Sequence, residues 1–155
     1  MRFVTLIAVG VLAASVSGCA NYYYDLIGRG EWPHEDNSLY SRLGGQQGVA
    51  AMVDGWVDAA SADPRIKGQF AKVDLTRFKA VLAQWVCVNA SGPCVYTGPG
   101  LIDAHTGLAI SEADFNAFID DLKKNLEAKQ VSTDDQEQLL SLLQTRRGSV
   151  VQVKG

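Results

Sequence analysis

Apolar residues recur at helical spacing in four separate segments, and this repeat constrains the fold more than any other feature of the chain. In segment 49–60 they fall at positions i, i+3, i+4, i+7, i+8 and i+11, which places them on one face of a helix. Similar spacing returns in segments 75–86, 115–126 and 139–143, and no segment alternates as a strand does. The sequence therefore predicts an all-α domain with four principal helices.

Polar residues that cap helices precede three of these segments. Asp74 stands directly before the helix predicted over 75–86, where its carboxylate can accept a hydrogen bond from a free backbone N–H. Segments 111–114 and 132–135 have the spacing of a capping box, which satisfies the first turn of a helix from both sides. These starts agree with the apolar periodicity, so the two signals support the same helices.

Helix-breaking residues set the remaining limits. The domain is predicted to begin near Ser38 with a short helix over 39–43. Pro64 ends the first long helix, because the residue before a proline avoids helical geometry. Gly148 is expected to stop the last helix. Segment 94–110 is rich in glycine and has no long helical period, so we expect an ordered loop there.

The first eighteen residues are predicted to be a lipoprotein signal peptide outside the fold. Arg2 gives a positive start, and the uncharged apolar run over 3–16 is shorter than the roughly 20 residues that a membrane span needs. The sequence Val-Ser-Gly-Cys at 16–19 resembles the lipobox of bacterial lipoproteins, which implies that Cys19 is lipidated. The alternative is a soluble secreted protein cleaved nearby.

Residues 19–37 are predicted to be a lipid-anchored tether. They hold three consecutive tyrosines, two glycines and a proline, with no sustained period. His34 lies in this segment and is expected to be a solvated linker histidine. Cys19 is followed by Ala20 and not by aspartate. In a Gram-negative envelope, this pattern resembles a signal for sorting to the outer membrane. We therefore expect a protein that is lipid-anchored to the outer membrane of a bacterium and faces the periplasm.

Export places the other two cysteines in a compartment where disulfides persist. Cys87 and Cys94 are seven residues apart, so a bridge would join the end of one helix to the loop after it. The alternative is a pair of free thiols. A metal site is poorly supported, because these cysteines have no third and fourth ligand nearby. We expect the disulfide.

Histidine is scarce in this chain. Apart from His34, His105 is the only one, and a lone histidine on a partly apolar turn is usually structural. The sequence has no Gly-x-Ser-x-Gly elbow, phosphate-binding glycine loop or His-Glu-x-x-His helix. Its net charge of -3, without a basic stripe, gives no reason to expect nucleic acid as a partner. The residues alone leave the role of His105 open.

Several short motifs, in this order and spacing, resemble group I truncated haemoglobins from Ser38 to about Val151. They are Ser-Leu-Tyr-Ser-Arg-Leu-Gly-Gly at 38–45, Ala-Asp-Pro-Arg-Ile at 62–66 followed by Phe70 and by Val-Asp-Leu at 73–75, Gly-Pro-Cys-Val-Tyr-Thr-Gly at 92–98, Ala-His-Thr-Gly-Leu at 104–108 and Ile-Ser-Glu-Ala-Asp-Phe at 110–115. The motifs at 92–98 and 104–108 are together similar to the segment that leads into the proximal helix of the family.

This resemblance implies a truncated globin domain over 38–151, with two helices packed across two others around a haem b. His105 corresponds to the proximal histidine, and neutral imidazole is a suitable ligand for iron. That ligation leaves the opposite axial position available for a gas. The side chains expected to contact the haem are His105, Phe70, Phe78, Leu82, Leu101 and Phe118.

The side that faces the gas departs from the family pattern. Many relatives carry Tyr and Gln at two positions that correspond here to Val57 and Phe78, and Val81 and Leu82 would complete an apolar wall. A missing hydrogen bond costs on the order of 1–3 kcal/mol, so we expect weak retention of O₂, with CO and NO less affected. Tyr96 is a candidate to replace the missing donor.

Reversible binding of O₂, NO or CO is the function that the resemblance implies. One alternative is a haem enzyme, an NO dioxygenase or peroxidase, but this needs a polar group beside the gas and an electron donor that the chain does not encode. Another is a haem-free helical envelope lipoprotein. Arg77 and Lys79 are candidates to pair with the haem propionates, or to stay solvated. The helix predicted over 75–86, which carries Phe78, has no histidine that could be a second axial ligand.

Overall fold

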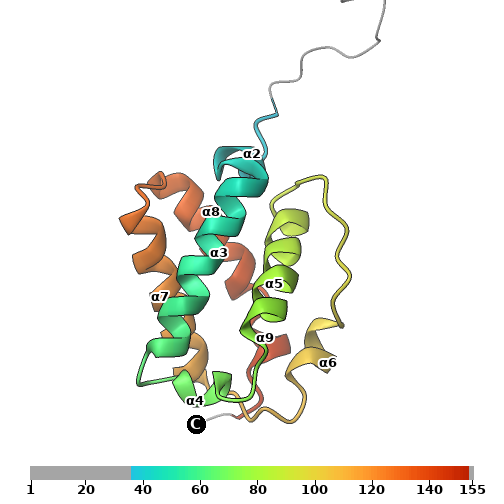
Figure 1. Cartoon of the computed structure of the whole chain (residues 1–155), viewed down its shortest axis with the longest axis vertical. Coiled ribbons are helices and arrows are strands. Elements are labelled where there is room, and N and C mark those ends of the chain that lie inside the picture. Colours follow the sequence, from blue (N-terminus) through green and yellow to red (C-terminus); the bar gives the residue numbers. More distant parts are fainter. Residues whose placement is uncertain (1–35, 154–155) are drawn as a thin grey trace, which may run out of the picture. The chain divides into compact units, whose positions relative to one another are not determined.

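The computed structural model describes residues 36–153, and its regular secondary structure in that range consists of helices joined by loops (Figure 1). The signal peptide, Cys19, His34 and the predicted tether up to residue 35 lie outside the described residues. Among residues 36–153, none of the helices combines the length and apolar character of a membrane span.

Eight helices follow one another in the described part of the chain. They are α2 (Leu39–Arg42), α3 (Gly45–Ala62), α4 (Lys67–Phe70), α5 (Leu75–Asn89), α6 (Leu101–His105), α7 (Glu112–Ala128), α8 (Thr133–Gln144) and α9 (Arg147–Val150). The only strand-like pairing in this range is an isolated bridge between Ser111 and Val153. The all-α prediction is confirmed, with α3, α5, α7 and α8 as the four long helices.

The predicted helix caps are present. The Asp74 carboxylate accepts a hydrogen bond from the Arg77 backbone N–H at the start of α5. Ser111 and Asp114 form a capping box at the start of α7, in which each side chain accepts from the other residue's backbone N–H. The Ser132 hydroxyl caps α8.

Two predicted limits are wrong. The expected loop over 94–110 contains α6, a helix of five residues that is too short to show an apolar period. Gly148 does not stop the last long helix, since α8 ends at Gln144 and Gly148 lies inside the short helix α9. The backbone of Gly148 is not in the left-handed region that makes glycine a stop.

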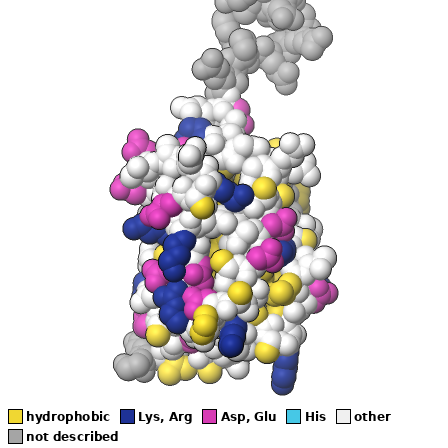
Figure 2. All heavy atoms as spheres, turned by 60° about the vertical axis from the view of Figure 1, so that its left-hand side comes forward, with side chains coloured by type: hydrophobic (Ala, Val, Ile, Leu, Met, Phe, Trp, Pro, Cys, Tyr) yellow, Lys and Arg dark blue, Asp and Glu magenta, His cyan; other side chains and the backbone are white. Residues whose placement is uncertain are grey.

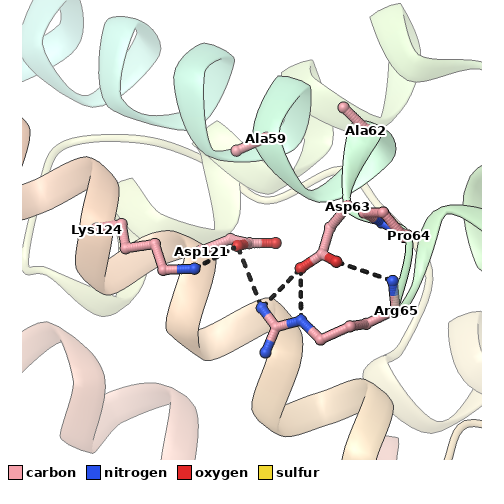
Figure 3. A pocket seen from close by; sticks show the side chains of 7 residues that line it. All are labelled: Ala59, Ala62, Asp63, Pro64, Arg65, Asp121 and Lys124. Atoms are coloured by element: carbon pink, nitrogen blue, oxygen red, sulfur yellow. Dashed lines mark hydrogen bonds and ion pairs between the residues drawn. The ribbon is translucent and has the colours of Figure 1, made fainter.

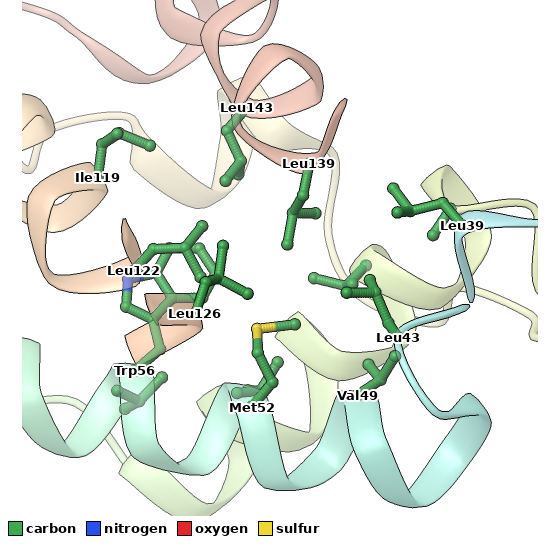
Figure 4. Close-up of a cluster of buried hydrophobic side chains, with 14 of the residues drawn as sticks. Leu39, Leu43, Val49, Met52, Trp56, Ile119, Leu122, Leu126, Leu139 and Leu143 are labelled. Atoms are coloured by element: carbon green, nitrogen blue, oxygen red, sulfur yellow. The ribbon is translucent and has the colours of Figure 1, made fainter. Parts of the chain in front are cut away.

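A tight corner joins α2 to α3. Gly44 and Gly45 adopt φ angles of 88° and 62°, a left-handed conformation that glycine takes at no steric cost. A Cβ atom on Gly48 would lie 1.9 Å from the Leu43 carbonyl oxygen, so only glycine allows this approach. The corner brings Leu43 and Val49 into the same core (Figure 4).

The main core lies between α3, α7 and α8. Trp56 and Met52 of α3, Leu122 and Leu126 of α7 and Leu139 of α8 point toward one another and are all almost fully buried (Figure 4). Burying a side chain of this size contributes roughly 1.5–3 kcal/mol. Helix α3 also packs along α5, and α7 packs on α8, so the long helices form two pairs.

A disulfide joins Cys87, near the end of α5, to Cys94 in the following loop. Their Cα atoms are 5.9 Å apart, a usual separation for such a bridge. The Gly92 backbone N–H donates to the Cys87 carbonyl oxygen, and the Thr97 N–H and hydroxyl both donate to the Gln84 side chain. The loop is therefore fastened to α5 at several points.

Charged side chains of both signs are interspersed on the face shown in Figure 2, where no single sign dominates. Many of the charges in the described residues are paired. Arg42 contacts Asp135 at 2.6 Å, and Arg65 contacts Asp120 at 3.0 Å. An exposed pair such as Arg65–Asp120 adds little to stability, about 0–1 kcal/mol.

Candidate functional site

A cavity of about 390 Å³ is lined by side chains of α4 to α9 and of the loops between them, and it is partly open to solvent. Its volume lies in the range of roughly 300–1,000 Å³ that is usual for small-molecule and cofactor sites. All six side chains predicted to form the site line this one cavity, although they come from four different helices. They are Phe70 of α4, Phe78 and Leu82 of α5, Leu101 and His105 of α6, and Phe118 of α7.

Aromatic rings make up one part of the wall. The ring centroid of Phe70 lies 5.9 Å from that of Phe78 and 6.0 Å from that of Phe118. Phe118 in turn stacks on Trp56, which belongs to the main core. The cavity is therefore an extension of the hydrophobic core that side chains do not fill.

His105 is half-buried at the C-terminal end of α6, and its imidazole is held in a defined orientation. The Nδ1 atom lies 2.7 Å from the Leu101 backbone carbonyl oxygen. A carbonyl oxygen can only accept, so Nδ1 carries the proton and donates it, which leaves the lone pair on Nε2. A backbone acceptor of this kind also increases the basicity of a metal-ligating imidazole. The residue can therefore act as a neutral nitrogen ligand.

The ligand count limits what His105 can bind. Within residues 36–153 no group of three or more His, Cys, Asp or Glu side chains is placed to hold a metal ion. A metal ion bound by His105 would therefore need its other ligands from a molecule other than these side chains. An apolar cavity with one imidazole therefore fits a metal that arrives inside an organic chelate, which brings its own nitrogens and buries its apolar faces.

The expected apolar wall on α5 is present, with one correction. Phe78, Val81 and Leu82 line the cavity, but Val57 does not. Val57 is fully buried in the main core instead. Trp85 also lines the cavity and was missed, although it stands one helical turn after Val81 and Leu82 on the same face.

Tyr96 reaches the cavity from the loop after α5. Its hydroxyl donates a hydrogen bond to the Pro99 carbonyl oxygen at 2.9 Å. The hydroxyl proton is thus already engaged, and Tyr96 in this conformation does not replace the donor that the α5 wall lacks.

Two arginines line the cavity, and the predicted lysine does not. Lys79 pairs with Asp58 and Asp54 of α3 at 2.7 and 3.7 Å, and these carboxylates raise its pKa. Arg77 of α5 and Arg146, between α8 and α9, both line the cavity. Neither guanidinium forms an ion pair with any residue between 36 and 153. Arg146 was not predicted, because its place depends on the break between two helices.

A second, open depression lies beyond the end of α3, lined by charged residues (Figure 3). Arg65 contacts Asp63 at 2.6 Å and the buried Asp121 at 3.5 Å. Hydrogen bonds from the Arg65 side chain and backbone lower the pKa of Asp63 to about 2. Burial, followed by the nearby charge of Asp63, raises the pKa of Asp121. These groups fasten α7 to the segment that leads into α4.

The comparisons with known proteins agree with this arrangement. Residues 38–152 match the family described as bacterial-like globin. The chain is 26% identical over 93 residues to a group 1 truncated haemoglobin of Tetrahymena pyriformis, covering 60% of this chain and 77% of that protein. It is 25% identical over 109 residues to one of Mycolicibacterium paratuberculosis, covering 70% and 80%.

A solved structure shows the same fold. The truncated haemoglobin of Tetrahymena pyriformis in its Fe(III) form superposes with a TM-score of 0.72 at 22% identity, over 76% of this chain and 100% of that one. The two pairs of long helices described above are thus the two-over-two arrangement of this fold.

Proposed function

The chain belongs to the bacterial-like globin family, and from that premise we propose that it holds a haem through His105 and binds O₂ or another diatomic gas reversibly. One observation carries the proposal. The Nδ1–H of His105 donates to the Leu101 carbonyl, so Nε2 is left as a ligand at the wall of an apolar cavity. Haem is a chelate of the class that such a cavity fits.

The lining residues match the parts of a haem. Phe70, Phe78 and Phe118 offer apolar and aromatic surface for the macrocycle, whose removal from water contributes roughly 25 cal/mol per Å². Arg77 and Arg146 line the same cavity without an ion pair to residues 36–153, so they are free to pair with the haem carboxylates.

The cysteines favour a haem b, which is held without a covalent bond to the protein. The sequence has no Cys-x-x-Cys-His motif, the usual attachment site of a c-type haem. Cys87 and Cys94 are joined to each other, so neither offers a free thiol to the cofactor.

The α5 wall sets how gases are held. A bound haem would supply the iron to which O₂, CO or NO binds. Phe78, Val81 and Leu82 present apolar side chains to the cavity and donate no hydrogen bond. O₂ gains most from such a donor, so these residues favour fast release of O₂. The same wall gives no acid–base assistance, which favours reversible binding over peroxidase-like turnover.

We also propose that the domain is lipid-anchored through Cys19 in the cell envelope, facing the periplasm at the outer membrane. The support is in the sequence, in the lipobox-like Val-Ser-Gly-Cys and the tether that leads to Ser38. Expression with a labelled fatty acid, followed by fractionation, tests this. Label in the membrane fraction that Cys19→Ala abolishes supports the anchor, and unlabelled soluble protein contradicts it.

The haem proposal is tested by reconstitution with haemin. We expect a Soret band, and a shift of that band when the reduced protein is exposed to CO. His105→Ala should lose the normal spectrum of a histidine-ligated haem. His34→Ala is the matched control, since it removes the only other histidine and should leave the spectrum unchanged. No Soret band in the unaltered protein, or an unchanged band in His105→Ala, would refute the proposal.

A further inference from the structure

The last described residues of the chain are hydrogen-bonded to the segment that directly follows α6. The backbone N–H groups of Gln152 and Val153 donate to the Ile110 carbonyl oxygen at 2.9 and 3.2 Å. The Ala109 N–H donates to the Gln152 side-chain Oε1 at 3.1 Å. Ser111 and Val153 complete the contact as an isolated bridge. The C-terminal segment thus holds residues 109–111 from both backbone and side chain.

The segment held in this way lies next to the site, and its backbone includes residues with positive φ angles. Leu108 and Ile110 line the cavity on either side of Ala109. Gly107 has a φ of 81°, and Ala109 has a φ of 52°, a left-handed conformation that is unfavourable for a residue with a Cβ. Such a conformation persists only where the surroundings enforce it, and the Gln152 side chain bonds the N–H of this very residue.

Helix α6 has little else to fix it. It is five residues long, and none of its residues is fully buried. Its principal helix contact in the described part of the chain is with α9, the helix that leads to Gln152. The carbonyl oxygen of His105 accepts from the Leu108 N–H, so a turn of only three residues connects the ligand to the held segment.

We propose that Gln152 is a positioning residue for His105. By holding Ala109 in its left-handed conformation, it fixes the turn after α6 and with it the direction in which Nε2 of His105 points. The bond from His105 to a haem iron would then depend on a side chain that is distant from it in the sequence. This inference rests on the proposed haem function, and it adds a residue that does not touch the cofactor.

Two substitutions separate the acceptor atom from the rest of the side chain. Only Oε1 of Gln152 is used, because its amide group donates to no residue between 36 and 153. Gln152→Glu keeps an oxygen in that place, and Gln152→Ala removes it. Gln46→Ala is the matched control, an exposed glutamine on α3 whose side chain makes no hydrogen bond within the described range.

The experiment uses the full-length protein loaded with haemin. We measure the rate of haem transfer to an excess of apomyoglobin, and the iron–histidine stretching band of the reduced protein by resonance Raman. Gln152→Ala should lose haem roughly threefold to tenfold faster, the effect of one neutral hydrogen bond, and should shift the band. Gln152→Glu should restore both values, and Gln46→Ala should not differ from the unaltered protein.

Two results would overturn the inference. One is a Gln152→Ala variant whose iron–histidine stretching band is unchanged. If this variant also unfolds at a lower urea concentration, Gln152 contributes to stability alone. The other is a Gln152→Glu variant that behaves like Gln152→Ala, since the acceptor oxygen would then not be the cause. A failure of the haem proposal looks different, because the unaltered protein would then show no histidine-ligated haem.

Discussion

Trp56 and Phe118 are joined by both a hydrogen bond and a ring stack. The indole Nε1–H of Trp56 donates to the Phe118 backbone carbonyl at 2.8 Å, and the two ring centroids are 4.3 Å apart. Trp56 is fully buried in the main core, whereas Phe118 lines the cavity. The pair therefore connects the main core at α3 directly to the wall of the candidate haem site.

Replacing Trp56 by phenylalanine should destabilise the protein. The variant loses the indole hydrogen bond and leaves unfilled volume in a fully buried place, which together cost about 1–3 kcal/mol. Urea unfolding followed by circular dichroism measures this loss. Trp85→Phe is the control, because the Trp85 indole donates no hydrogen bond to residues 36–153 and is only partly buried. Equal losses in both variants would show that the hydrogen bond to Phe118 is unimportant.

The fold was largely predictable from local patterns. Each long helix carries an apolar face of its own, and α5, α7 and α8 also begin at a capping side chain (Asp74, Ser111 and Ser132), so for these three both signals lie within a few residues of each other. Helix α6 gave no such signal, because five residues are too few to show a period. The break between α8 and α9 was also missed, since α8 ends at Gln144, before the glycine that was expected to stop it.

The cavity was predicted in part. The family motifs led to His105 and its apolar neighbours, and the structure brings them together. The resemblance places Val57 in the wall because it corresponds to the position where many relatives carry Tyr, but its side chain lies in the main core. Arg146 and Val150 line the cavity from the end of the chain, and no local pattern indicates a contact between segments so far apart.

The Asp63–Asp121 pair should make stability depend on pH. Folded Asp121 keeps its proton to higher pH than it does in the unfolded chain, because burial raises its pKa above the ordinary 3.8. Above pH 4 the folded state therefore binds more protons, and this group lowers stability as the pH rises through the raised pKa. Asp63 acts oppositely, and its contribution is lost as the pH falls from about 4 to its lowered pKa of about 2.

Asp121→Asn tests this assignment. Asparagine stays neutral and can donate to Asp63, so the variant should gain stability relative to the unaltered protein as the pH rises from 4 to 8. Urea midpoints at four or five pH values give the difference. Asp134→Asn, which removes an exposed carboxylate on α8, controls for the change in net charge. A difference for Asp121→Asn that does not change with pH would contradict the raised pKa.

The disulfide should stabilise the loop that carries Tyr96. Cys87 and Cys94 are seven residues apart, and closing so short a loop is worth about 2–3 kcal/mol in the chain-entropy account. The double variant Cys87→Ala, Cys94→Ala should be less stable by that amount and should lose haem faster, since Tyr96 and Pro99 line the cavity. Adding dithiothreitol should weaken the unaltered protein but not the double variant. Equal urea midpoints for the two oxidised proteins would contradict this prediction.

The last prediction concerns the gas-facing wall on α5. Phe78 lines the cavity and offers no hydrogen-bond donor, so the unaltered protein should release O₂ quickly. Phe78→Gln introduces a donor, and one hydrogen bond of about 1–3 kcal/mol should slow release roughly tenfold to a hundredfold. Stopped-flow displacement of O₂ by CO measures the rate. Phe78→Leu keeps the wall apolar and should not slow it. Slow release from the unaltered protein, unchanged in Phe78→Gln, would mean that a donor other than α5 already reaches the bound gas.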